Sequence, residues 1–127
     1  MKYGNKKVEI DGIEFDSKKE ARRYCELQRR LLMGEIEELE LQTKFELIPA
    51  QYETFPRYGK KGQRIKDGKR CIEKSCTYKA DFTYKQDGQL IVEDVKGYRD
   101  PASAAYARFT IVRKLMLWRY GIQIVEI

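Results

Sequence analysis

Histidine is absent from this chain of 127 residues, and its absence excludes several kinds of catalytic and metal site. Nucleases with a His general base, zinc fingers with His ligands and most catalytic zinc centres are removed from consideration. Any catalysis must use carboxylates, Lys, Tyr, Cys or a hard metal ion held by oxygen atoms. Carboxylates with Mg²⁺ are the natural remainder, because Mg²⁺ prefers oxygen ligands.

Cysteine and long apolar segments are also scarce. The three cysteines, Cys25, Cys71 and Cys76, are an odd number and too few for a disulfide scaffold, so we expect reduced thiols and a cytoplasmic protein. A zinc knuckle needs four ligands, which these residues do not supply. There is no apolar run of about 18 residues and no apolar signal region, so we expect no membrane span.

Positive charge is abundant and is concentrated in one stretch. The formal net charge is +6, and the segment from Arg57 to Lys79 contains only Asp67 and Glu73 as acids. A basic patch on a nearly neutral body is typical of a protein that contacts phosphates, although a solvated loop has the same composition. The basic residues that we expect to contact DNA are Arg57, Lys60, Lys61, Arg64, Lys66, Lys69, Arg70, Lys74 and Lys79.

Two helices are predicted, one in each half of the chain. Ser17 and Glu20 form a capping box that opens a helix running to about Met33. A second helix is predicted from Ser103 to Tyr120. Its apolar side chains occur nearly all round, which indicates mostly core packing: Tyr106, Phe109, Ile111, Val112, Leu115, Met116 and Trp118.

The remaining patterns predict strands. Asp11-Gly12 and Asp87-Gly88 each read as a two-residue turn of a hairpin. Residues 122–127 form a closing strand, which should follow the second helix in a right-handed parallel crossover. The result is a single α+β (α/β) domain over 1–127, a mixed sheet flanked by two main helices. Two less regular parts are a strand-prone region at 36–55, with Phe45, Leu47 and Ile48 buried, and a basic loop or two-stranded wing at about 56–76.

The turn at Asp87-Gly88 determines which residues of its hairpin face one another. With a type I′ turn, Asp81 lies directly opposite Asp94. A slip by one residue would replace Asp94 with Glu93, but Glu93 would then leave the face of Lys96, so Asp94 is the predicted ligand. That face collects Lys79, Asp81, Thr83, Asp94 and Lys96, and the other face is mostly apolar.

Two directly opposed carboxylates need an explanation, because like charges about 4.5–5.5 Å apart destabilise a sheet. A divalent cation between Asp81 and Asp94 would turn repulsion into coordination. Lys96 could then hold a water or polarise a phosphate oxygen, which is sufficient for phosphodiester hydrolysis. The alternative is a surface charge ladder in which Lys79 and Lys96 pair with the two aspartates, and spacing alone does not separate the two readings.

The order Asp81, hairpin, Asp94-Val95-Lys96 resembles the D…(D/E)xK signature of the PD-(D/E)xK nuclease superfamily. Ala80 stands where the name of that superfamily has a proline. The chain also resembles a small phage-encoded family of putative endonucleases and Holliday junction resolvase-like proteins. The matching segments, in order, are Tyr3-Gly-Asn-Lys6, Phe15–Tyr24, Tyr78–Phe82 and Val92–Gly97.

The resemblance implies a restriction-endonuclease-like fold and a Mg²⁺-dependent endodeoxyribonuclease, with Mn²⁺ able to substitute. In the superfamily both acids bind metal and the lysine supports the attacking water, which gives these roles to Asp81, Asp94 and Lys96. The likeness to phage recombination and junction-resolving enzymes implies action on branched or duplex DNA. It also implies a homodimer, because paired incisions need two active sites related by a two-fold axis.

Glu20 has two possible roles. A helix before the sheet often supplies one more acid to the metal in this superfamily, and Glu20 matches that position. As the third residue of its helix, it also suits a capping bond to the Ser17 amide. Glu20 shares a helical face with Tyr24, Leu27 and Leu31, which directs it toward the sheet.

Other basic residues and other functions remain open. Arg22 and Arg23 are expected at the surface or on phosphates, and Arg113 and Lys114 could approach the cleft or face solvent. The alternatives to an enzyme are a DNA-binding module without catalysis and a structural phage subunit that uses the basic wing.

Overall fold

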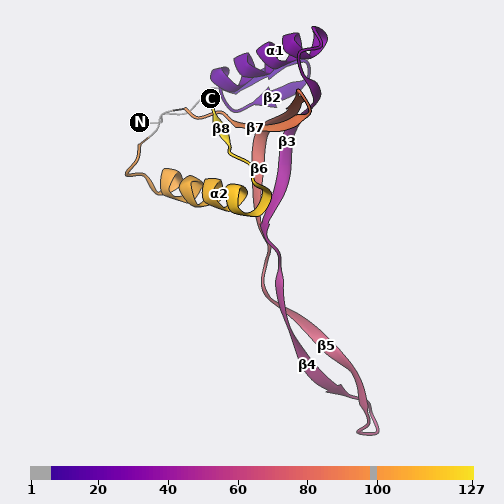
Figure 1. The fold of residues 1–127 in the computed structure, drawn as a ribbon. Coiled ribbons are helices and arrows are strands. Elements are labelled where there is room, and N and C mark those ends of the chain that lie inside the picture. The colour runs from indigo at the N-terminus through magenta and orange to yellow at the C-terminus, as the bar shows by residue number, and fades with distance from the viewer. Residues whose placement is uncertain (1–6, 98–99) are drawn as a thin grey trace. The chain divides into compact units, whose positions relative to one another are not determined.

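The structure is a computed structural model that describes residues 7–97 and 100–127. The chain forms two compact units, one of Met1–Lys44 with Lys79–Ile127 and the other of Phe45–Tyr78. Helices and sheets are mixed, which confirms the predicted α+β class (Figure 1). The elements in chain order are β1 (Val8–Ile10), β2 (Ile13–Phe15), α1 (Lys18–Leu32), β3 (Glu37–Ile48), β4 (Gln51–Tyr58), β5 (Arg64–Glu73), β6 (Cys76–Gln86), β7 (Gln89–Asp94), α2 (Ala104–Tyr120) and β8 (Val125–Glu126).

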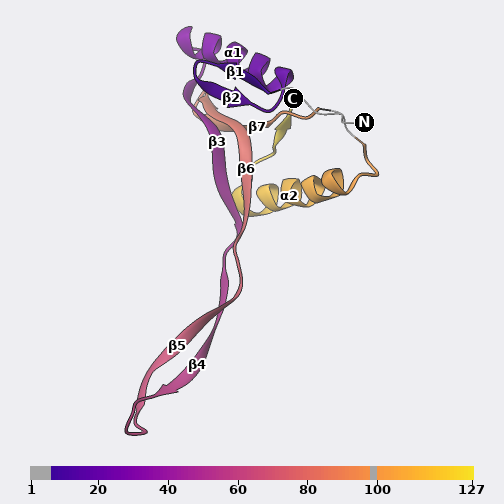
Figure 2. The same ribbon diagram turned by 180° about the vertical axis from the view of Figure 1, so that it is seen from behind.

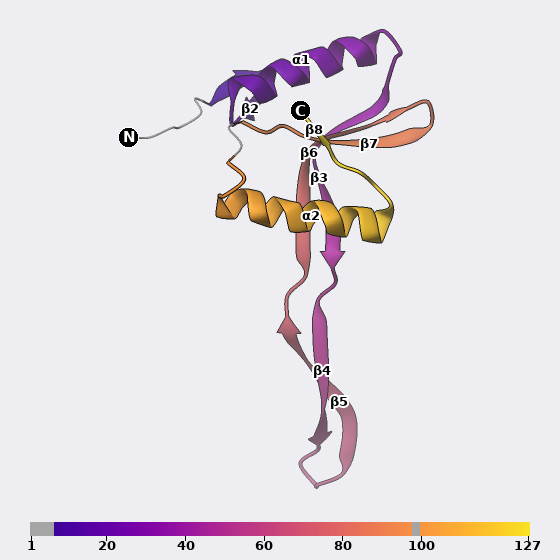
Figure 3. The ribbon, with the colours of Figure 1, turned by 60° about the vertical axis from the view of Figure 1, so that its left-hand side comes forward.

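The first unit is organised around a four-stranded sheet with the order β3-β6-β7-β8. β6 and β7 are antiparallel, whereas β8 runs parallel to β7, as predicted for the crossover through α2. α1 and α2 lie on opposite sides of this sheet (Figure 3). The short β1–β2 hairpin lies beside α1 (Figure 2).

Both predicted two-residue turns are present. Asp11 and Gly12 have φ values of 53° and 77°, and Asp87 and Gly88 have 52° and 77°. Positive φ at both central residues defines a type I′ turn, whose twist matches that of the flanking strands. The predicted register of the second hairpin is confirmed from Gln86↔Gln89 through Phe82↔Glu93.

α1 begins at its predicted cap, where the Glu20 amide donates to Ser17 Oγ at 3.1 Å. Its buried face contains Glu20, Ala21, Tyr24 and Leu27. This face packs in a core with β1, β2 and the sheet, because the amphipathic stripe of a helix must be covered. Members of this core are Phe15, Ala21, Tyr24, Leu27, Ile36, Phe82 and Tyr84.

α2 has the predicted ends but not the predicted burial. Ser103 caps its first turn, and Gly121 ends it with a φ of 67°. Of its described residues only Phe109 and Met116 are fully buried, whereas Ile111 is 60% and Trp118 79% exposed. The prediction that the helix is mostly core was wrong, because a helix on one face of a sheet buries only a stripe of its surface.

The second unit contains the antiparallel pair β4–β5, which corresponds to the two-stranded alternative predicted for the basic wing. The pairing shifts between Phe55 and Arg57, where Pro56 interrupts the ladder; Pro is tolerated at such irregularities because it has no N–H to donate. Leu47 is buried as predicted. Ile48 is 39% exposed, contrary to prediction, because neighbouring residues of a strand point to opposite sides.

Within the described residues, neither helix is long and apolar enough to cross a membrane.

Candidate functional site

Asp81 lies on β6, where several polar groups meet its carboxylate. The Val95 amide donates to Asp81 Oδ2 at 2.8 Å, one step beyond the last paired residues of β6 and β7. Gln42 Nε2, on β3, lies 3.5 Å from Asp81 Oδ1. The Asp81 carboxylate is therefore held by residues of both neighbouring segments, by Gln42 of β3 and by Val95, which directly follows β7.

The surroundings of Asp81 disfavour its charged form. Burial is the largest cause of a pKa raised to about 7, followed by a hydrogen bond with Glu20; the charges of Glu20 and Asp94 raise the pKa further. The hydrogen bond from Val95 acts in the opposite direction. At neutral pH the Asp81 carboxyl group is therefore protonated in a large fraction of molecules, because its pKa lies close to that pH.

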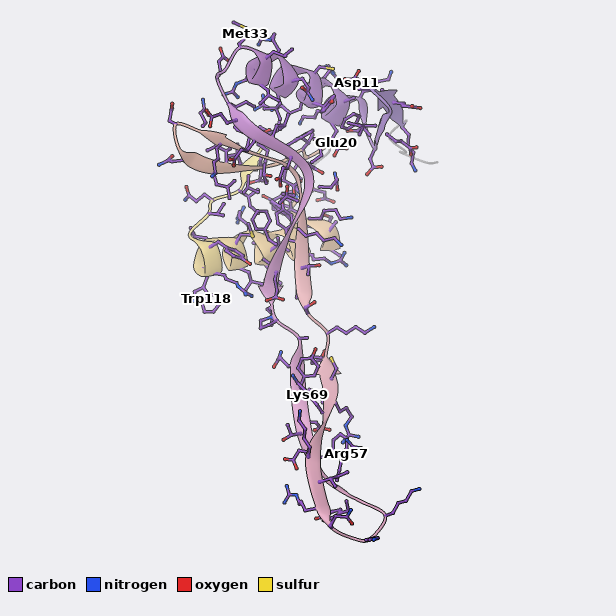
Figure 4. The ribbon with its side chains drawn as sticks, turned by 90° about the vertical axis from the view of Figure 1, so that its right-hand side faces the viewer. Asp11, Glu20, Met33, Arg57, Lys69 and Trp118 are labelled. Carbon is purple, nitrogen blue, oxygen red and sulfur yellow. The ribbon has the colours of Figure 1, made fainter. Side chains whose placement is uncertain are left out.

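Glu20 combines two roles that the sequence presented as alternatives. Its Oε2 accepts from the Asp16 amide at 3.3 Å, so it caps α1, although through Asp16 and not through the predicted Ser17 amide. Its carboxyl group also hydrogen-bonds to Asp81. The side chain is buried, and it lies at the end of α1 that meets the sheet (Figure 4).

Asp94 and Lys96 form the other half of the site. Lys96 Nζ lies 3.1 Å from Asp94 Oδ1 and 3.5 Å from the centre of the Phe109 ring on α2. The backbone is fixed as well: the Ile127 amide donates to Asp94 O at 2.9 Å, and the Lys96 amide donates to Ile127 O at 3.1 Å. The Asp94–Lys96 segment is therefore held by β8 on one side and by Asp81 on the other.

Glu93 has a separate, structural role in the core and does not pair with Lys96 as its neighbour Asp94 does. Its carboxylate is 1% exposed and accepts from Arg23 Nε at 2.8 Å and from Arg23 Nη2 at 2.6 Å. Tyr84 also donates its hydroxyl to Glu93. The prediction that Arg23 is a surface or phosphate-binding residue was therefore wrong; Arg22 is exposed.

The chemistry of the carboxylates at this site suits a hard divalent cation, whereas their spatial arrangement suits it less well. Carboxylate oxygens are the ligands that Mg²⁺ prefers, and a cation would offset the charges of Glu20 and Asp94 that, after burial and the Glu20 hydrogen bond, raise the pKa of Asp81. Within residues 7–97 and 100–127, no three Asp, Glu, His or Cys side chains are arranged to hold a metal ion. As they stand, the carboxyl groups of Glu20 and Asp81 contact each other, and Asp94 pairs with Lys96.

The basic residues of the arm, by which we mean β4, β5 and their connecting turn, are all exposed, and so are Lys74 and Lys79. Arg64 pairs with Asp67 at 2.8 Å, and Arg70 pairs with Glu53 at 2.7 Å. The part of the chain that the structure describes offers no acidic partner to Arg57, Lys60, Lys61, Lys66, Lys69, Lys74 or Lys79. Arg57 and Lys69 are labelled on the arm in Figure 4.

Aromatic side chains stabilise both faces of the arm. Lys69 Nζ lies 4.1 Å from the centre of the Tyr52 ring, and the Arg70 guanidinium lies 5.0 Å from that of Phe55 on the other face. A Cβ on Gly68 would lie 2.2 Å from Phe55 Cζ, so the ring covers this glycine closely. These contacts with cations account for the positions of the Tyr52 and Phe55 rings within the arm.

Sequence reasoning missed Gln42, Thr43 and Phe109 as neighbours of the site. None of them belongs to a recognisable motif, and the positive φ of Gln42 has no glycine to signal it. Arg113 contacts Glu126 at 3.8 Å, and Lys114 is exposed on α2. All three cysteines are free and exposed. The segment Tyr3–Lys6 lies outside the described residues.

Comparison with known proteins gives one result. Residues 1–121 match the family described as "Protein of unknown function (DUF1064)". No curated protein matches the chain. No solved structure matches it either. Since the match covers nearly the whole chain, the protein belongs to the DUF1064 family.

Proposed function

We propose that this protein is a metal-dependent DNA endonuclease of the PD-(D/E)xK type. The observation that supports it most is the meeting of three acidic side chains beside a lysine. Glu20 contacts Asp81, the charge of Asp94 acts on Asp81, and Lys96 pairs with Asp94 at 3.1 Å. A fold gains no stability from crowding like charges, so such a cluster is a candidate for function.

In this proposal Asp81, Asp94 and Glu20 hold Mg²⁺ or Mn²⁺ through their oxygen atoms. A bound cation supplies a Lewis acid for a phosphate oxygen and a water of lowered pKa. Lys96 would orient the attacking water, whose oxygen would form a bond to phosphorus as the bond to the leaving deoxyribose oxygen breaks. The proton released by the water ends on that leaving oxygen.

The exposed basic residues of the arm support DNA as the substrate. Seven of the nine predicted DNA-contacting cations have no acidic partner among the described residues, so they are available to phosphates. Contacts of this kind position a duplex without reading its sequence. We propose branched DNA, such as a four-way junction, and a homodimer acting in the cytoplasm of a phage-infected host, as the superfamily resemblance implies.

The alternative is a DNA-binding or structural phage protein without catalysis. The hydrogen bond between the carboxyl groups of Glu20 and Asp81, with no three-ligand group among the described side chains, favours this alternative. The arm would bind DNA equally well in either case.

A cleavage assay separates the two functions. Labelled duplex, nicked, flap and four-way-junction DNA are incubated with Mg²⁺, Mn²⁺ or EDTA. We expect metal-dependent cutting by the wild type and a loss of about 100-fold or more in Lys96→Ala. Lys85→Ala is the matched control, because Lys85 lies on the same hairpin and pairs with Glu38 at 3.2 Å, away from the site. Absence of metal-dependent cutting on every substrate would sink the enzyme proposal, and gel filtration tests the dimer.

A further inference from the structure

The backbone of β3 departs from regular strand geometry at Gln42. This residue has a φ of 55° in the middle of a strand of 12 residues, with no turn on either side. Residues other than glycine seldom adopt this left-handed conformation, because their Cβ crowds the backbone. Such residues persist where the surrounding structure requires them, and they concentrate at functional sites.

The departure changes the direction of the side chains that follow it. Gln42 Nε2 reaches Asp81 Oδ1 at 3.5 Å, and Thr43 Oγ1 lies 2.7 Å from Thr83 Oγ1. Asp81 and Thr83 are two residues apart on β6, so they share one face of the sheet. Gln42 and Thr43 are consecutive, yet they contact that same face, which requires the alternation of β3 to break between them, as in a β-bulge.

The residues before the break face the opposite way. Leu39 and Leu41 pack against the core beside α1, together with Phe82 and Tyr84. A regular strand would place Thr43 on that same side, away from Thr83. Because of the conformation of Gln42, the two leucines of β3 before it face the core, whereas the side chains of Gln42 and Thr43 face the carboxylate site.

We propose that Gln42 is a positioning residue of this site, an inference that rests on the proposed function. Its neutral amide donates to Asp81 Oδ1 while the Val95 amide holds Oδ2. Donors on both oxygens fix the orientation of the carboxylate without adding a charge that would compete with a cation. Groups that hold a metal ligand in this way control the affinity of the metal site.

Gln42→Gly is the variant that tests this role. Glycine adopts a positive φ without steric cost, so the variant keeps the backbone conformation and removes only the amide side chain. Glu38→Gly is the matched control. Glu38 also has a positive φ, 53°, on β3, but its side chain is exposed and pairs with Lys85.

Three measurements are made on the full chain. In the metal-free protein, ¹⁵N–¹H spectra should show displaced side-chain amide signals for Gln42, which return to ordinary positions in Asp81→Ala. The Tm of Gln42→Gly should equal or exceed that of the wild type, as should the Tm of Glu38→Gly. Titration with Mn²⁺ should give about 10-fold weaker binding for Gln42→Gly and unchanged binding for Glu38→Gly.

The outcomes separate this inference from the nuclease proposal. Equal Mn²⁺ affinity in the wild type and Gln42→Gly overturns the positioning role, as does a Tm of Gln42→Gly well below that of Glu38→Gly. A wild type that binds Mn²⁺ but cuts no DNA overturns the nuclease alone, and the affinity ratio still decides the role of Gln42. A wild type that binds no Mn²⁺ overturns both.

Discussion

The carboxylate site and the arm both contain many charged residues, but the two regions hold those residues in different ways. Around the sheet, Glu20, Glu93 and Asp94 are buried, and two of them have partners on other elements of the fold: Glu20 contacts Asp81 on β6, and Glu93 contacts Arg23 on α1. On the arm the cations are exposed, and the ion pairs that exist join residues of the same two strands. These charged side chains near the sheet are buried, whereas those of the arm are exposed to solvent.

This difference determines how each region responds to change. A buried charge depends on its partners, because removing one leaves the other without compensation. An exposed charge is screened by salt and acts almost independently of its neighbours. We therefore expect substitutions near the sheet to be severe and strongly coupled, and those on the arm to be mild and additive.

The largest effect should follow loss of the buried ion pair. Arg23→Ala leaves Glu93, 1% exposed, without its bidentate partner, and should lower the free energy of unfolding by about 3–5 kcal/mol. Arg64→Ala is the control on the arm, where the pair with Asp67 is exposed, and should cost less than about 1 kcal/mol. Urea denaturation measures both, and comparable losses would contradict the contrast between the two regions.

A smaller effect of opposite sign is expected at Asp81. Because its pKa is raised to about 7 from 3.8, the folded state binds its proton more tightly than the unfolded chain, so stability decreases as pH rises between these values. Asp81→Asn removes this penalty and should stabilise the protein on the order of 1 kcal/mol above pH 7, after allowance for partial exposure.

Thermal denaturation from pH 4 to pH 8 measures the effect of Asp81→Asn, which should also abolish any metal-dependent cutting. Asp87→Asn, in an exposed turn, is the control and should leave the pH dependence of stability unchanged. An Asp81→Asn variant with the pH dependence of the wild type would show that the pKa of Asp81 is not raised in the folded protein.

The smallest effects should come from single cations of the arm. Lys60→Ala and Lys61→Ala each remove one potential phosphate contact, and each should reduce the slope of log K against log salt by about 1. Fluorescence anisotropy on a duplex at several salt concentrations measures the slope. Lys85→Ala serves again as the control, and an unchanged slope in both arm variants would place the phosphate contacts elsewhere.

Local sequence signals predicted much of the fold. The Asp-Gly turns and the Ser17 cap involve neighbours in sequence, so their chemistry can be read directly. The turn at Asp87-Gly88 was enough to derive the register that separates Glu93 from Asp94. These features required no knowledge of how distant segments pack.

Features that depend on distant packing were not predictable in this way. Arg23 pairs with a residue 70 positions away; its spacing from Glu20 and Leu27 places it beside the buried face of α1, but no local pattern identifies Glu93 as its partner. The exposed side of α2 depends on how much of the sheet it covers. The break at Gln42 is required by Asp81 and Thr83 on another strand, and only glycine would have signalled a positive φ.

A register error in the β6–β7 hairpin would affect both the core and the carboxylate site. Glu93 and Asp94 are adjacent, yet one stabilises the core through Arg23 and the other pairs with Lys96. A shift of one residue would exchange their faces, so the same slip would bury an unmatched charge and dismantle the carboxylate site. A stably folded molecule with a misaligned site should therefore be rare, because the error that spoils the chemistry also destabilises the fold and exposes the chain to degradation.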